Sequence, residues 1–193
     1  MGSLYSMKTL YIIAGANGSG KTTFAKSFAD FNDLYFINAD EIAKELDKDN
    51  ITKYQFRAGK IFFQRFKERF PLDKSFIIET TLSGIYLINY IKKAQNLGYR
   101  VSLIYLFLEN TDINISRVKN RVLNGGHHIP EDDIIRRYHR SKNLFFNVYK
   151  ELVDEWIIYY NSNDIFEEIA DKNNIFDTLK YSEFVKDLNA NNR

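Results

Sequence analysis

The 193-residue chain has no cysteine, no long apolar run and almost no net charge, and each absence excludes a class of protein. Without cysteine there is no disulfide framework, no thiol catalysis and no zinc site built on thiolates. No run of about 18 apolar residues could span a bilayer, and the segment 1–7 is too short for a signal peptide. Lys and Arg number 27 against 25 Asp and Glu, so no global field favours nucleic acid or a membrane surface. We expect a cytoplasmic protein in which any basic site is local.

Bulky apolar residues are plentiful. Hydrophobic residues make up 45% of the chain, with 16 Phe and 13 Tyr. A chain of this length buries roughly 70% of the surface that its unfolded form would expose. The composition therefore predicts one compact domain over residues 1–193, without covalent staples.

Short β-rich runs alternate with segments of helical composition. The predicted strands are residues 8–14, 34–37, 76–78, 99–108 and 156–160. The predicted helices are 21–30, the EIAKEL segment after Asp40, 52–70 with Thr52 as its cap, 85–97, 112–123, 130–140 continuing to about 153, and 178–188 in a polar tail from about 162 to 193. Because no hairpin signal separates the first four strands, crossover connections are expected. The fold class is α/β, with a mainly parallel sheet of about five strands covered on both sides.

A glycine-rich loop follows the first strand and opens the first helix. Its sequence matches the phosphate-loop pattern G-x-x-x-x-G-K-[ST] in full, and the predicted nucleotide-binding residues are Gly15, Ala16, Asn17, Gly18, Ser19, Gly20, Lys21, Thr22 and Thr23. Backbone N–H groups and the helix N-terminus suit phosphate, Lys21 suits the β- and γ-phosphates, and the Thr22 hydroxyl suits Mg²⁺. The motif in this context predicts a P-loop NTPase three-layer sandwich that binds a nucleoside triphosphate.

Acidic residues end the second and third predicted strands. Ligands of open parallel sheets bind beyond the carboxyl ends of the strands, so Asp40 and Glu79 are expected at the same crevice as the phosphate loop. Asp40 is the predicted catalytic base for a phosphate-accepting hydroxyl, although an aspartate here also suits the N-cap of the following helix. Glu79 could bind a sugar hydroxyl or hold Mg²⁺ through water, with Thr80 and Thr81 as neutral neighbours, or could be a solvated strand end.

Basic residues concentrate between Arg117 and Lys142, where seven Lys and Arg face three acids. We expect this segment, within a helical lid at about residues 111–153, to place positive charge over the transferred phosphate. Arg121 and either Arg136 or Arg137 are the predicted catalytic arginines. The alternative is a solvated helix face with ion pairs.

Two further patterns favour structural roles over ligand binding. His127 and His128 lack other metal ligands nearby in the sequence, so we expect them to order a loop. The phenylalanines of the long helix recur at helical spacing, which favours core packing over base stacking; they are Phe56, Phe62, Phe63, Phe66 and Phe70.

Four segments together resemble the zeta toxin family, and more closely its small chromosomal branch often described as predicted ABC-type ATPases. They are the phosphate loop, Asn38-Ala39-Asp40, Glu79-Thr80-Thr81 and the run RVLNGGHHIP from Arg121 to Pro130. Zeta toxins are P-loop kinases that phosphorylate UDP-N-acetylglucosamine at the sugar 3′-hydroxyl with ATP or GTP, and an antitoxin protein holds them inactive. The resemblance covers about residues 9–161.

The resemblance implies roles for matching positions. Lys21 and Thr22 match the nucleotide and Mg²⁺ residues, Asp40 the base, and Glu79 the acidic residue of the substrate site. Arg121 and Arg136 or Arg137 match the two lid arginines. Glu-Thr-Thr stands where toxins more often have Glu-Gly-Thr, which leaves the sugar-nucleotide substrate and an antitoxin as further expectations. A nucleoside or polynucleotide kinase and a non-catalytic NTP-binding switch or ATPase module are the alternatives.

Overall fold

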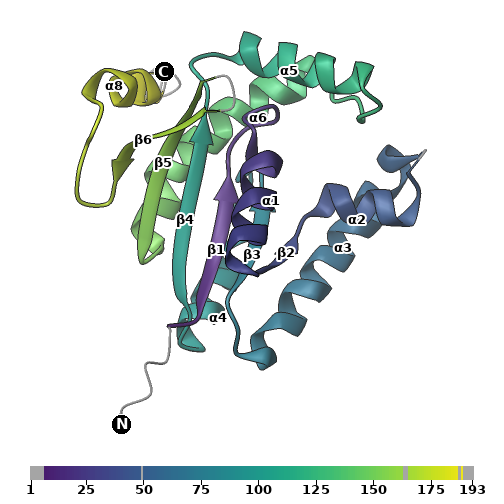
Figure 1. The fold of residues 1–193 in the computed structure, drawn as a ribbon, viewed down its shortest axis with the longest axis vertical. Coiled ribbons are helices and arrows are strands. Elements are labelled where there is room, and N and C mark those ends of the chain that lie inside the picture. The colour runs from purple at the N-terminus through teal and green to yellow at the C-terminus, as the bar shows by residue number, and fades with distance from the viewer. Residues whose placement is uncertain (1–6, 49, 163–164, 187, 189–193) are drawn as a thin grey trace.

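The computed structural model describes residues 7–48, 50–162, 165–186 and 188, and confirms the predicted α/β class (Figure 1). Its strands form one sheet of six in the order β2-β3-β1-β4-β5-β6. The strands are β1 (Thr9–Ala14), β2 (Tyr35–Ile37), β3 (Phe76–Thr80), β4 (Arg100–Phe107), β5 (Glu155–Ser162) and β6 (Ile165–Asp171). The first five are parallel to their neighbours, and β6 is antiparallel to β5.

Helices cover both faces of this sheet. They are α1 (Lys21–Asn32), α2 (Ala39–Leu46), α3 (Ile51–Arg69), α4 (Ile88–Asn96), α5 (Thr111–Leu123), α6 (Glu131–Leu144), α7 (Lys150–Leu152) and α8 (Thr178–Lys186), with a 3₁₀ turn at Phe70–Leu72 and a π-helical turn at Phe145–Tyr149. Within the described residues, no helix is long and apolar enough to cross a membrane.

The alternation of side chains along β1 explains the layers. Leu10 and Ile12 point into a core shared with α3, α4, the π-helical turn and α8, whereas Ile13 packs on the other face against Ala25 and Ala29 of α1. Successive strand residues face opposite sides, so a strand buried on both faces is apolar throughout. This is why the apolar runs that predicted these strands were continuous.

The register of the parallel strands brings the strand ends together. Ala14, the last residue of β1, pairs with Thr80 at the end of β3, and Ile37 of β2 pairs with Ile78. The residues that follow each strand therefore emerge at one edge of the sheet. Helices α5 and α6 lie beyond this edge and pack on each other through Val118, Ile129 and Ile134 (Figure 1).

Two local predictions were wrong. The tail contains strand β6, which was missed because five of its seven residues are at least partly exposed, so it carries little apolar signal. The long helix begins at Ile51, with Asn50 before it, so Thr52 lies inside the helix and does not cap it. The predicted helix of the tail is confirmed as α8.

Candidate active site

The phosphate loop runs from the end of β1 into α1. Gly15 and Gly18 have φ values of 143° and 81°, in the region that disfavours L side chains. A Cβ atom at Gly15 would lie 2.2 Å from the carbonyl oxygen of Leu106, and one at Gly18 would lie 2.5 Å from that of Asn114. The loop therefore needs glycine at both positions, for its conformation and for its close approach to neighbouring backbone.

Two buried asparagines from distant segments hold the loop. Asn114 of α5 donates from Nδ2 to the carbonyl oxygen of Asn17 at 2.6 Å. Asn161 of β5 donates from Nδ2 to the carbonyl oxygen of Ser19 at 2.9 Å. Sequence reasoning missed both residues. Each fixes a carbonyl oxygen of the loop and so helps to hold the loop conformation.

Lys21 lies buried at the mouth of the loop. Its Nζ donates to the carbonyl oxygen of Ala16 at 2.8 Å. Burial lowers the pKa of Lys21, while the carboxylates of Glu79 and Asp40 act in the opposite direction. The ammonium group thus sits between backbone oxygens and two carboxylates, at a place where an added anion would compensate its burial.

Glu79 is half-buried and accepts two side-chain hydrogen bonds, so it is held in place and not freely solvated. Thr22 Oγ1 donates to Glu79 Oε1 at 3.0 Å. Asn38 Nδ2 donates to Glu79 Oε2. Burial raises the pKa of Glu79, and Lys21 opposes this shift. A hydroxyl and a carboxylate side by side, next to the phosphate loop, are the oxygen ligands that suit Mg²⁺.

Asp40 is the second residue of α2. The N-cap of this helix is Asn38, whose Oδ1 accepts hydrogen bonds from the backbone N–H groups of Asp40 and Glu41 at 2.6 and 3.1 Å. The alternative in which Asp40 caps the helix is therefore wrong. Its side chain is 42% exposed and lines the cleft described next.

A cleft of about 750 Å³ joins these groups. One wall consists of the phosphate loop with Arg117, Asn120 and Arg121 of α5, and the other of Gly59, Phe62, Phe63 and Tyr86. Asp40, Glu79, Thr80 and Thr81 lie between the walls. A smaller cavity of about 340 Å³ shares Asn17, Asp40 and Thr81 with the cleft, and is lined further by Gln55, Ser83, His127, Arg136 and Arg137.

The three predicted arginines are placed differently. Arg121 lines the main cleft, and its Nε is buried without a hydrogen-bond partner among the described residues. Arg137 donates from Nη1 to Asn17 Oδ1 at 3.3 Å, so it reaches the phosphate loop. Arg136 donates to Asp133 Oδ1 at 2.8 Å on the exposed side of α6. A phosphate in the cleft would give Arg121 Nε the acceptor that it lacks.

The aromatic helix α3 has a double role. Phe62, Phe66 and Phe70 are buried, as core packing predicts. Phe56 is 77% exposed, so the prediction of core packing was wrong there. Phe62 and Phe63 also face the cleft, where Tyr86 packs edge-on against Phe63 with ring centroids 5.5 Å apart. The periodicity revealed the buried face but gave no sign that it borders a cleft.

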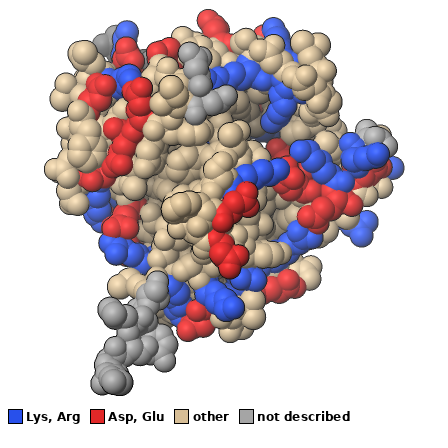
Figure 2. All heavy atoms as spheres, viewed as in Figure 1, with Lys and Arg blue, Asp and Glu red and all other residues tan. Residues whose placement is uncertain are grey.

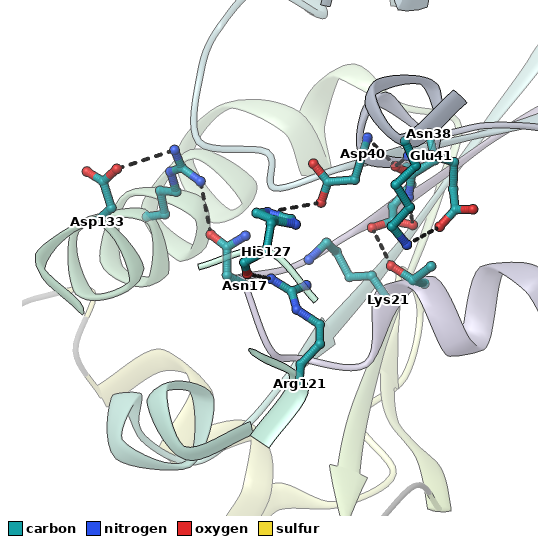
Figure 3. Close-up of polar contacts among 12 residues, drawn as sticks. Asn17, Lys21, Asn38, Asp40, Glu41, Arg121, His127 and Asp133 are labelled. Carbon is teal, nitrogen blue, oxygen red and sulfur yellow. Dashed lines mark hydrogen bonds and ion pairs between the residues drawn. The ribbon is translucent and has the colours of Figure 1, made fainter. Parts of the chain in front are cut away.

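His127, the first of the two adjacent histidines, lies next to the predicted base. His127 Nε2 is 3.8 Å from Asp40 Oδ2, and its side chain is 7% exposed (Figure 3). In the part of the chain that the structure describes, no group of three or more His, Cys, Asp or Glu could hold a metal ion. The sequence predicted only that the two histidines order a loop, so the position of His127 next to Asp40 was not expected.

Comparison with known proteins places this geometry in a family. Residues 5–177 match the Zeta toxin family. An uncharacterized protein of Haemophilus influenzae is 36% identical over 124 residues, which cover 64% of this chain and 88% of that protein.

Solved structures share the fold at low sequence identity. The AvrRxo1-ORF1:AvrRxo1-ORF2 complex with sulphate ions superposes with a TM-score of 0.74 and 14% identity, over 92% of this chain and 63% of that chain. The chain thus spans less than two thirds of that AvrRxo1 chain. The PezAT chromosomal toxin-antitoxin system of Streptococcus pneumoniae gives a TM-score of 0.65 and 18% identity, over 95% and 78%. Since the family match extends over most of the chain, the protein belongs to the zeta toxin family.

Proposed function

We propose that the protein transfers the γ-phosphate of ATP or GTP to a hydroxyl group of a small molecule, with the sugar 3′-hydroxyl of UDP-N-acetylglucosamine as the first candidate. One observation carries the proposal: Asp40 and the phosphate-loop residue Lys21 line the same cleft. A carboxylate beside the phosphate loop is what an acceptor hydroxyl needs to be oriented and deprotonated.

The nucleotide side of the cleft fits a triphosphate. The N–H groups of the loop and Lys21 would bind the β- and γ-phosphates. The Thr22 hydroxyl, supported by Glu79, would hold Mg²⁺, which neutralises phosphate charge when it is bound. Arg121 and Arg137 would stabilise charge on the transferred group, and Arg136 is the third candidate. A structure of the AvrRxo1-ORF1:-ORF2 complex with ATP shares the fold at a TM-score of 0.72, which supports this assignment.

The acceptor side of the cleft is aromatic. Phe62, Phe63 and Tyr86 line it, and Thr80 Oγ1 lies 2.8 Å from the Tyr86 hydroxyl. A sugar or base ring has an apolar face that stacks on such a wall and polar edges that reach hydroxyl groups. Asp40 would act as general base, with Glu79, Thr80 and Thr81 as the other substrate-binding residues.

Two wider roles follow from the family. A protein antitoxin is the proposed partner, and the cytoplasm the proposed location; the PezAT structure is described as a toxin-antitoxin system. A polynucleotide end is the second candidate acceptor, because a chain of the Pnkp1/Rnl/Hen1 RNA repair complex shares the fold with a TM-score of 0.59 and 22% identity, over 72% of this chain and 46% of that one. On the face shown in Figure 2, however, Lys and Arg are interspersed with Asp and Glu and form no continuous basic track.

The test is mass spectrometry of UDP-N-acetylglucosamine and, separately, of a 5′-hydroxyl oligonucleotide, each incubated with protein, ATP and Mg²⁺. We expect phosphate on the sugar nucleotide. Asp40→Asn should bind ATP normally and transfer phosphate at least ~10²-fold more slowly, because Asn keeps the size of the side chain without its basicity. Transfer that survives in Asp40→Asn would place the base elsewhere. If neither acceptor gains phosphate while ATP binds, the switch or ATPase alternative is favoured.

A further inference from the structure

The turn after α5 is shaped by a glycine that tolerates no side chain. The backbone N–H of Gly126 donates to the carbonyl oxygen of Arg121 at 2.9 Å. A Cβ atom at Gly126 would lie 2.6 Å from Arg121 Cγ and 2.9 Å from that carbonyl oxygen. The chain therefore folds back tightly over Arg121, and the next residue, His127, lines the smaller cavity that adjoins the cleft.

His127 lies next to both Asp40, the predicted base, and Arg121 of the lid. Its imidazole Nε2 lies 3.8 Å from Asp40 Oδ2. Its carbonyl oxygen accepts a hydrogen bond from Arg121 Nη2 at 3.3 Å. In Figure 3 the imidazole of His127 points toward the carboxylate of Asp40, with Arg121 on the side of the lid. The lid loop thus places a side chain that is 7% exposed beside the predicted base, at a separation slightly longer than a hydrogen bond.

The charges around the imidazole favour its neutral form. Burial lowers the pKa of His127, and the Asp40 carboxylate opposes the shift. Three cations also lower this pKa: Arg121 of α5, Lys44 of α2 and Arg137 of α6. A neutral imidazole can direct one N–H toward a carboxylate oxygen without removing the negative charge on which basicity depends.

We propose that His127 is a positioning residue for Asp40: its imidazole, carried by the lid loop, holds one carboxylate oxygen so that the other faces the acceptor hydroxyl. The inference rests on the proposed role of Asp40 as base. Because misplacement of a reacting group by about 1 Å can cost up to about 10²-fold in rate, loss of the imidazole should slow transfer by up to that factor.

The first experiment needs no acceptor. The chain has three histidines, so NMR can follow each imidazole through a pH titration. Asp40→Asn should lower the pKa of His127, because it removes the anion that favours imidazolium. An unchanged pKa of His127 would overturn the proposed contact, whatever the acceptor of the enzyme is.

The second experiment separates positioning from proton transfer. His127→Ala should keep ATP affinity and lower kcat for the acceptor by about 10- to 10²-fold. His127→Gln, whose amide nitrogen can reach a similar place, should restore most of the rate. His128→Ala is the matched control, because His128 is not among the described residues lining either cavity. Equal losses in the Gln and Ala variants, or an equal loss in His128→Ala, would overturn the positioning role.

Discussion

Asn38 both caps α2 and hydrogen-bonds to Glu79. Substitution of Asn38 should therefore lower the unfolding free energy more than substitution of an ordinary capping residue. Its Oδ1 accepts from two backbone N–H groups, and its Nδ2 donates to the half-buried carboxylate of Glu79. Loss of an Asn cap costs typically about 1 kcal/mol of unfolding free energy. Loss of the amide hydrogen bond to the carboxylate of Glu79, a charged acceptor, adds about 1–3 kcal/mol. Asn38→Ala should therefore lower the unfolding free energy by about 2–4 kcal/mol.

Thermal and urea unfolding would measure this loss. At about 2–4 °C per kcal/mol for a chain of this size, Asn38→Ala should lower the Tm by roughly 5–15 °C. Asn110→Ala is the matched control, because Asn110 caps α5 through one bond to the N–H of Ile113 at an exposed site. It should lose only the capping contribution, about 1 kcal/mol.

A second substitution at the same position isolates the Glu79 contact. Asn38→Asp keeps a good cap but turns a carboxylate toward Glu79, so it should destabilise the protein although the helix start is intact. The reasoning is refuted if Asn38→Ala loses no more stability than Asn110→Ala, or if Asn38→Asp is as stable as the wild type. Either result would mean that the contact with Glu79 contributes nothing.

Three further predictions concern the cleft. In phosphotransfer assays Arg137→Ala should lower kcat by about 10²- to 10⁵-fold and Arg136→Ala by much less, because only Arg137 reaches the phosphate loop; the reverse order would contradict the lid geometry. Gly59→Ala should raise the unfolding free energy by about 0.5–1 kcal/mol, since a Cβ atom there has no neighbour within 4 Å. Gly59→Leu should instead raise the KM for the acceptor while ATP affinity stays unchanged. If alanine destabilises the protein, the fold requires this glycine. In a Lys21→Met background, Glu79→Gln should raise the unfolding free energy at neutral pH, because burial raises the pKa of Glu79 and so disfavours its charged form. This gain in unfolding free energy, measured by urea unfolding, should shrink as pH falls through the raised pKa toward 4.5. A gain that does not depend on pH would contradict the prediction.

Local patterns were sufficient for much of the fold. The apolar runs predicted β1 to β5 because a strand buried on both faces must be apolar along its whole length. Strand β6 lies at the edge of the sheet, where only Ile169 and Ala170 are buried, so its sequence resembles a polar tail. From the sequence, Asp40 was a candidate N-cap of α2, whereas in the structure Asn38 is the N-cap. Sequence alone could not choose between them, because Asn and Asp cap helices equally well.

The candidate site divides in the same way. The phosphate loop was readable because its chemistry is contained in consecutive residues. The asparagines that hold it are 97 and 142 residues away from their partners in the chain, and nothing in their local sequence marks them. The choice between Arg136 and Arg137 could not be made from helical spacing, since two adjacent arginines differ only in the direction that α6 gives them.

The sequence by itself determined a phosphate loop, the strands that deliver acidic residues to one edge, and a segment rich in arginine. These properties are encoded in neighbouring residues through backbone conformation and apolar periodicity. The tertiary structure alone decided that Glu79 accepts hydrogen bonds from Thr22 and Asn38, that aromatic side chains line the same cleft as Asp40, and that His127 lies next to the Asp40 carboxylate. The physical reason is that strand register and lid packing, which no single segment contains, set the distances between these side chains.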